Sequence, residues 1–295
     1  MAGTVIVGSG GRLGAALLRE WSRAGEEVVG LSRSELDLAD ADQLRNRLGG
    51  MQFDVLVNCA AQTNVDRCET NAEEAFAINR DAVRVLAEIC SARGARCIHI
   101  STDYVFDGEK TTPYVEEDPA RPISQYGASK HEGEEVLLAV DPAHLAVRVS
   151  WVFGPDRPSF VDQVVQRALT NETAEAIGDK WAVPTYTLDV AELLRPFLRA
   201  KREGGLLHLC NGGSCTWQEY GQFALDCAAS AGLPLQARTV GPLKMAELKA
   251  FIARRPVHTV MSTAKLTRIT GAQPRSWQEA VQEYVATHLV PRLWK

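Results

Sequence analysis

A tyrosine and a lysine four residues apart are the side chains best suited to act together in catalysis. Tyr126 and Lys130 lie near the start of a predicted helix, where residues four apart share one face. An ammonium group beside a phenol stabilises the phenolate and lowers its pKa from about 10 towards the range of a useful acid or base. Such a pair alone is common on solvated helix faces, so its meaning depends on the other motifs.

Polar side chains also follow a predicted strand upstream of this helix. Ser101-Thr102-Asp103 comes directly after an apolar run at residues 97–100. In open parallel sheets, ligands bind in the crevice beyond the carboxyl ends of the strands. A hydroxyl group at this point is therefore predicted to face the same cleft as the tyrosine and the lysine.

A glycine-rich turn separates the first apolar run from the first helical pattern. Gly8, Gly11 and Gly14 fit G-x-x-G-x-x-G, whereas Leu13 occupies the place of the last glycine in the G-x-G-x-x-G of ordinary dehydrogenases. Pyrophosphate requires backbone N–H groups at a helix N-terminus and no side chain that blocks its approach. A tight structural turn is the simpler alternative, but the strand before it and the helix after it favour a dinucleotide site.

The end of the second predicted strand bears on the choice of cofactor. An acidic residue there would bind the ribose 2′-hydroxyl and repel a 2′-phosphate. This chain has Ser32 and Arg33 instead, a hydroxyl and a guanidinium that suit a phosphate. NADPH is therefore favoured. The alternative is that Arg33 is solvated and Glu35 binds the ribose, which would admit NADH.

These motifs are positioned by short apolar runs that alternate with helical patterns, as in a parallel sheet covered by helices. Strands are expected at residues 5–7, 28–31, 55–57, 97–100 and 145–147, and helices at 12–24, 72–93 and 124–138. The predicted fold class is α/β, a doubly wound parallel sheet of the Rossmann type with a smaller C-terminal substrate-binding lobe.

The division into lobes follows from a change of pattern near residue 150. Residues 1–150 are predicted to form the dinucleotide-binding lobe, completed by segments near 175–210, and residues 151–295 to form mainly the substrate-binding lobe. The run Leu206-Leu207-His208-Leu209 is a candidate strand that returns to the first lobe. The acidic run at 116–118 is expected to be a solvated loop.

Composition excludes several classes of protein. The 295 residues are 45% hydrophobic and 23% charged with a net charge of -5, which argues against a nucleic-acid surface. Seven scattered cysteines without a C-x-x-C pair predict reduced thiols, and six histidines lack metal-ligand spacing, so no metal is expected. No window approaches the ~20 apolar residues of a membrane span, so we expect a cytoplasmic protein.

Taken together, the motifs resemble the extended short-chain dehydrogenase/reductases, and within them the dTDP-4-dehydrorhamnose reductase family. The stretches at 101–108 (Ser-Thr-Asp-Tyr-Val-Phe-Asp-Gly) and 150–154 (Ser-Trp-Val-Phe-Gly) are the most specific. The other matching segments are residues 8–14, Asn58-Cys59-Ala60-Ala61, residues 126–130, Pro184-Thr185, Arg255-Pro256 and Lys265-Leu266.

The resemblance implies reduction of the C4 keto group of a nucleotide-linked sugar by NADPH, with Tyr126 as proton donor. It implies a catalytic set of Thr102, Tyr126 and Lys130, and substrate contacts from Thr102, Asp103 and Trp151. The implied cofactor contacts are Gly11, Arg12, Leu13, Asp37, Leu38, Ala60, Ala61 and Gln62, together with Tyr126 and Lys130.

The sequence departs from its relatives at three places, and two alternative functions stay open. Thr102 is followed by Asp103-Tyr104 rather than the Asp-Glu of similar 4,6-dehydratases, which disfavours dehydration. Residues 179–184 replace the usual D-Q-x-G-x-P, and Gln62 stands where an aromatic residue or histidine is frequent, so the identity of the sugar is the least secure inference. The alternatives are a reductase or epimerase of another nucleotide sugar, and a non-catalytic NADP-binding protein similar to the methionine adenosyltransferase β subunit. A monomer or a homodimer fits either reading.

Overall fold

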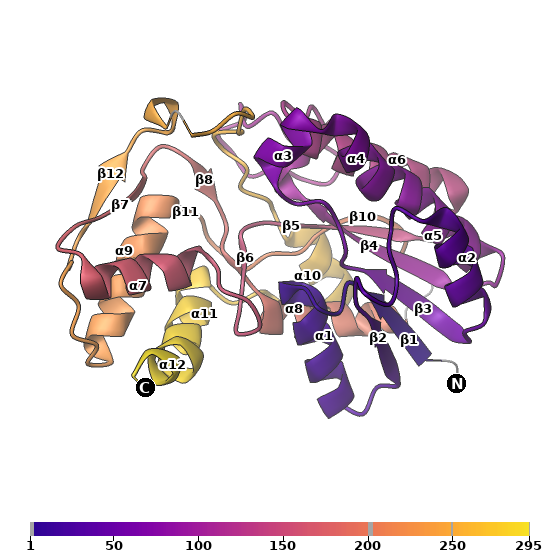
Figure 1. Cartoon of the computed structure of the whole chain (residues 1–295), viewed down its shortest axis with the longest axis horizontal. Helices are drawn as coiled ribbons and strands as arrows, with labels where there is room; N and C mark the ends of the chain where they lie inside the picture. Colours follow the sequence, from indigo (N-terminus) through magenta and orange to yellow (C-terminus); the bar gives the residue numbers. More distant parts are fainter. Residues whose placement is uncertain (1–2, 200–202, 249, 295) are drawn as a thin grey trace.

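The computed structural model describes residues 3–199, 203–248 and 250–294, and a six-stranded parallel sheet forms its centre (Figure 1). The strand order β10-β5-β4-β3-β1-β2 confirms the predicted doubly wound sheet. Because β2 and β3 lie on opposite sides of β1, the order of the strands reverses there, and ligands bind at such switch points. The strands are β1 (Gly3–Val7), β2 (Val28–Leu31), β3 (Phe53–Asn58), β4 (Arg96–Thr102), β5 (Leu145–Val149) and β10 (Gly205–His208).

Helices cover both faces of this sheet, which explains why its central strands are nearly continuous apolar runs (Figure 1). One face packs on α1 (Arg12–Arg23), α8 (Thr187–Leu194) and α10 (Ala264–Thr270). The other packs on α2 (Ala41–Gly49), α5 (Ala82–Ser91) and α6 (Gln125–Val140). Trp21 of α1 is fully buried, and its indole donates a 2.7 Å hydrogen bond to the carbonyl of Ala191 in α8. No helix in the described part of the chain is long and apolar enough to cross a membrane.

Two predicted helices differ in detail from the observed ones. The helix expected at 72–93 is divided into α4 (Ala72–Phe76), a π-helical turn (Ala77–Asp81) and α5. Asn79 in this turn is buried and donates to the hydroxyl of Ser129 in α6 at 3.0 Å. The helix expected at 124–138 is α6, and Ser124 caps it by accepting from the N–H of Gly127 at 3.2 Å.

A second apolar core lies beside the sheet and contains many aromatic rings. Phe153, Tyr186, Tyr220, Trp277 and Tyr284 are among its aromatic members. Its elements are β6 (Val152–Phe153), α7 (Phe160–Thr170), β7 (Ala174–Ile177), β8 (Trp181–Ala182), β9 (Thr185–Tyr186), β11 (Cys215–Thr216), α9 (Trp217–Ser230), β12 (Val240–Leu243), α11 (Trp277–Tyr284) and α12 (Val290–Leu293) (Figure 1).

Segments from both halves of the chain contribute to each core. Phe106 and Tyr114 pack into the second core, whereas β10 pairs with β5 in the sheet, as the apolar run at 206–209 predicts. The acidic run at 116–118 is not wholly solvated, because Glu116 is buried and accepts a 2.9 Å hydrogen bond from the N–H of His208. The boundary near residue 150 stays a prediction.

The glycine turn yields a stability prediction. A Cβ atom on Gly14 would lie 2.3 Å from the carbonyl oxygen of Gly8, which is backbone and cannot move aside. We expect Gly14→Ala to lower the free energy of unfolding by about 1–3 kcal/mol through overpacking. The control is Gly49→Ala in α2, where a Cβ meets no atom within 4 Å and helix propensity favours alanine by up to ~1 kcal/mol. Urea denaturation measures both, and equal stability of the two variants would contradict the close approach.

Candidate active site

A cavity of about 740 Å³ opens at the carboxyl ends of β1, β3, β4 and β5. It brings the glycine turn, the residues after β2 and the polar residues of β4 and α6 around one space. The predicted site residues that line it are Gly8, Gly11, Arg12, Leu13, Ser32, Arg33, Ala60, Ala61, Thr102, Asp103, Tyr126, Lys130 and Trp151.

The glycine turn forms a cradle with no room for side chains at its base. Gly8 has a φ of +83°, and a Cβ atom there would lie 2.7 Å from the backbone nitrogen of Ala60. Its N–H donates to the carbonyl of Leu31 at 2.8 Å, which ties the turn to the end of β2. The N-terminus of α1 therefore faces the cavity with bare backbone, which fits a pyrophosphate.

Two arginines join this turn to the segment after β6. The guanidinium of Arg12 donates to the carbonyls of Val152 and Arg157, both at 3.2 Å, and to that of Pro158. In return, Arg157 donates to the carbonyl of Gly10 at 2.9 Å. Burial lowers the pKa of Arg12, although nearby Asp162 opposes this. Arg157 also lines the cavity, and no motif in the sequence predicts that position.

At the end of β2, the contacts favour the predicted phosphate site over the alternative. Arg33 and Ser32 line the cavity, whereas Glu35 does not. The carboxylate of Glu35 is occupied by Ser32, because it accepts from the Ser32 N–H at 2.9 Å and from its hydroxyl at 2.7 Å. The charged group that faces the cavity at the end of β2 is thus the guanidinium of Arg33 and not the carboxylate of Glu35.

Four predicted cofactor contacts lie outside the lining of the cavity and stay predictions. Gly14 packs under the turn, and Leu38 is buried in the apolar core beneath α2 and α5. Asp37 is exposed, and its carboxylate accepts from the N–H of Ala39 at 3.1 Å.

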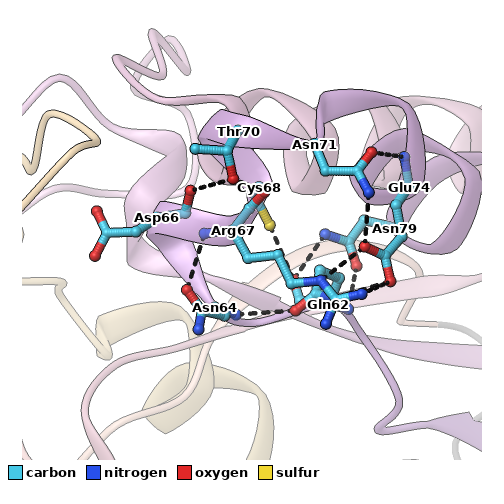
Figure 2. Close-up of polar contacts among 9 residues, drawn as sticks. All are labelled: Gln62, Asn64, Asp66, Arg67, Cys68, Thr70, Asn71, Glu74 and Asn79. Atoms are coloured by element: carbon cyan, nitrogen blue, oxygen red, sulfur yellow. Dashed lines mark hydrogen bonds and ion pairs between the residues drawn. The ribbon is translucent and has the colours of Figure 1, made fainter.

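Gln62, the fourth, belongs to a polar network around α3 (Val65–Thr70) and α4 (Figure 2). Its side-chain amide donates to Glu74 at 3.3 Å, and its backbone carbonyl accepts from Asn79 at 3.0 Å. Arg67 pairs with the same Glu74 at 2.8 Å. These contacts hold the loop that leads from Ala60 and Ala61 to α3.

Tyr126 lies on α6 beside Thr102 at the end of β4. Its side chain is only 9% exposed, and its ring meets that of Tyr104 edge to face at 5.6 Å between centroids. Burial raises the pKa of Tyr126, while its hydrogen bond with Thr102 acts to lower it. Lys130 is not among the groups that shift this pKa, so burial outweighs the predicted lowering and favours the protonated phenol as a proton donor.

The contacts of Lys130 explain why the pKa of Tyr126 is not lowered as the sequence predicts. Its Nζ donates to the carbonyl of Ile100 at 2.7 Å and lies 2.9 Å from Nε2 of His99. The side chain is 1% exposed, and burial lowers the pKa of Lys130 to about 7. The structure thus places the lysine in the cavity with its nitrogen turned towards β4.

Asp103 is the centre of a buried network that the sequence did not predict. Its carboxylate accepts from the hydroxyls of Thr259 at 2.5 Å, Ser150 at 3.1 Å and Thr102 at 3.2 Å. Burial raises the pKa of Asp103, while the charge of Lys180 acts to lower it.

Lys180 belongs to the segment at 179–184 that departs from the family pattern. It is fully buried, donates to the carbonyl of Pro256, and lies over the ring of Tyr104 at 4.9 Å from the centroid. Burial lowers the pKa of Lys180 to about 8, and Asp103 opposes this shift. The departure therefore brings a second buried lysine behind the predicted substrate residues.

Trp151 forms the wall between the main cavity and a smaller one of about 100 Å³. It is the one described non-glycine residue with a positive φ, at 38°, a conformation that costs of order 1–3 kcal/mol. The stacked ring of Tyr220, with centroids 6.4 Å apart, and the edge-on ring of Trp217 at 5.3 Å hold it there. The strain is located at a predicted substrate contact.

The sheet, the glycine cradle and the Thr–Tyr–Lys set define a dinucleotide-binding fold of the extended short-chain dehydrogenase/reductase class. The chain belongs to the family described as "RmlD substrate binding domain", which matches residues 2–290.

Relatives match along almost the whole chain. It is 35% identical to the spore coat polysaccharide biosynthesis protein SpsK of Bacillus subtilis, covering 97% of each. It is 32% identical to a dTDP-4-dehydrorhamnose reductase of Sinorhizobium fredii, covering 95% of each. A crystal structure of a dTDP-4-dehydrorhamnose reductase of Bacillus anthracis in complex with NADP superposes with a TM-score of 0.89 at 27% identity, covering 96% of this chain and 98% of the other.

The Asp103–Lys180 pair can be tested with a double-mutant cycle. Removing one partner leaves the other charge buried, so we expect Asp103→Asn and Lys180→Met each to cost about 3 kcal/mol or more. The double variant should cost at least about 1 kcal/mol less than the sum of the two. Urea denaturation supplies the four stabilities.

The exposed pair Arg45–Glu88, at 3.1 Å, serves as the control. Its coupling energy should stay within about 1 kcal/mol, because solvent screens exposed ion pairs. Additive costs at Asp103 and Lys180 would show that the two charges do not interact.

Proposed function

We propose that the protein is an NADPH-dependent reductase of the C4 keto group of a nucleotide-linked deoxysugar, like the dTDP-4-dehydrorhamnose reductases that it resembles. One observation carries this proposal: a single cavity joins a bare glycine cradle to Thr102, Tyr126 and Lys130. Its volume is in the range of cofactor and ligand sites. The named relatives support dTDP as the nucleotide and dTDP-rhamnose formation as the pathway.

The residues of the chain would bind and protonate the substrate. When bound, NADPH supplies the hydride. Tyr126 donates its proton to the keto oxygen, and its raised pKa keeps that proton available at neutral pH. The hydroxyl of Thr102, which donates to Asp103 in the ligand-free protein, would turn to donate to the same oxygen. Asp103 would then accept a hydrogen bond from a sugar hydroxyl. Trp151 offers an aromatic face to the sugar ring.

One feature supports NADPH over NADH, a second supports a catalytic role over a regulatory one, and a third supports a cytoplasmic location. Arg33 lines the cavity, whereas Glu35 is held by Ser32. A regulatory protein similar to the methionine adenosyltransferase β subunit is not favoured, because curated relatives matched over most of the chain are named as reductases. The described cysteines are all free, which supports a cytoplasmic site of action. We keep a monomer or a homodimer as the assembly.

Tyr126→Phe tests the proton donor. We expect turnover of a dTDP-4-keto-6-deoxy sugar to fall about 10²–10⁴-fold, because the phenylalanine ring cannot donate a proton. NADPH affinity should be unchanged within a factor of a few, since the ring itself is kept. Absorbance at 340 nm follows turnover, and fluorescence titration gives the affinity. Unchanged turnover would remove Tyr126 from the mechanism, and activity towards no nucleotide sugar in the unmodified protein would refute the proposed function.

Arg33→Met tests the cofactor preference. Loss of a charge-assisted hydrogen bond worth about 1.5–3 kcal/mol should raise the KM for NADPH about 10–100-fold and leave that for NADH nearly unchanged. Arg23→Met, at an exposed arginine paired with Glu20 at the end of α1, is the matched control. If the ratio of the KM for NADPH to the KM for NADH is the same in Arg33→Met as in the unmodified protein, Arg33 is solvated and does not contact the 2′-phosphate.

A further inference from the structure

Three buried side chains form a continuous row beneath the cavity, from Asn58 at the end of β3 through His99 of β4 to Lys130 of α6. Asn58 and His99 are 0% exposed and Lys130 is 1% exposed. The amide nitrogen of Asn58 lies 3.1 Å from Nδ1 of His99, and Nζ of Lys130 lies 2.9 Å from Nε2. Both ring nitrogens of the histidine therefore face nitrogen atoms.

The direction of the Asn58 amide is fixed at its other end. Its Oδ1 accepts a 3.1 Å hydrogen bond from the backbone N–H of Ala60, a residue that lines the cavity. The reversed amide would direct an NH₂ group at that N–H. The NH₂ group of Asn58 therefore points at His99, and Nδ1 of the ring must be the acceptor.

This orientation sets the protonation of the next two groups. A neutral imidazole carries one proton, so Nε2 of His99 holds it and points it at Lys130. An ammonium group has no lone pair with which to accept that proton. Lys130 satisfies both contacts only as a neutral amine that donates to the carbonyl of Ile100 and accepts from His99.

The charged groups around the row are compatible with a neutral lysine. Glu134, on the same helix, faces both Lys130 and His99, but its carboxylate is already paired with Arg148 at 2.6 Å. Cys59, after β3, also faces Lys130, and burial raises the pKa of that thiol to about 12, so it carries no charge. Burial likewise holds the pKa of His99 well below its usual value, which favours the neutral imidazole over the imidazolium.

We propose that His99 is a positioning residue that holds Lys130 neutral in the ligand-free protein and couples its charging to a change of ring tautomer. When the pair gains one proton, Nε2 passes its proton to Nζ of Lys130 and Nδ1 takes up the new one. The Asn58 amide must then turn over to accept from Nδ1, which releases the N–H of Ala60 into the wall of the cavity.

The role of this proton coupling in catalysis rests on the proposed function. Only a charged lysine can stabilise the phenolate that Tyr126 becomes after proton donation. Because the same step frees the backbone N–H of Ala60, a predicted cofactor contact, cofactor binding and lysine charging would favour each other.

The test is the tautomer of His99, read from long-range proton–nitrogen NMR spectra of ligand-free protein labelled with ¹⁵N-histidine. We expect the Nε2–H form above about pH 8, the Nδ1–H form below about pH 6, and no imidazolium between them, with a midpoint near the pKa of about 7 of Lys130. The chain has six histidines, and loss of a signal in His99→Gln assigns the one in question. If that variant does not fold, single variants of the other five assign it by elimination.

Lys130→Met provides the decisive comparison, because it removes the partner and leaves the ring. There His99 should keep the Nε2–H form across the range, since Asn58 still donates to Nδ1. The control is His144→Gln, a buried histidine that contacts Cys97, Ser91 and Ala87 and not the row, and it should leave the His99 switch unchanged.

Three outcomes would overturn the proposal: an Nδ1–H ring at alkaline pH, no switch between pH 6 and 8, or a switch that persists in Lys130→Met. The measurement uses neither cofactor nor substrate. A protein inactive towards every keto sugar could still show the switch, and an active reductase could lack it, so the two proposals fail separately.

Discussion

A buried ion pair between α6 and β5 fixes the helix that carries both predicted catalytic side chains. Glu134 and Arg148 are 2% and 1% exposed at the side chain and make two hydrogen bonds, at 2.6 and 2.9 Å. Although burial acts to raise it, Arg148 lowers the pKa of Glu134 to about 2, so the carboxylate stays charged. Because residues 126, 130 and 134 follow each other at helical spacing, this contact sets the face that α6 turns towards the sheet.

Other parts of the site are held through the same pair. The hydroxyl of Ser101 donates to Glu134 at 2.5 Å, which places the end of β4, and hence Thr102, against α6. Arg148 also contacts His208 at 3.4 Å, so β10 is joined to the network although it follows β5 by more than fifty residues. Loss of either charge would leave the other buried without compensation, a cost of about 3–5 kcal/mol. The same buried pair therefore both positions α6 and stabilises the sheet.

The fold could be predicted from the sequence because its signals are local. A β-branched run, a glycine turn and an apolar helical period indicate β1 and α1 without knowledge of distant residues, and the same holds for Tyr126 and Lys130 on α6. The π-helical turn at Ala77–Asp81 could not be predicted, because it depends on Asn79 reaching Ser129 fifty residues away. The contacts of Arg12 with the carbonyls of Val152 and Arg157 join positions still farther apart, by 140 and 145 residues.

The environment of the buried ionisable side chains could not be predicted from the sequence. Glu116 belongs to an acidic run that resembles a solvated loop, and Lys180 to a segment that departs from the family pattern. Both are buried by segments that arrive from elsewhere in the chain. Spacing alone predicts that Lys130 lowers the pKa of Tyr126, because it places an ammonium beside a phenol. In the folded chain, burial raises the pKa of Tyr126 and lowers that of Lys130 to about 7. The pKa of each titratable group in this site depends on its buried neighbours. Which groups become neighbours is decided by the folding of the whole chain and not by local sequence.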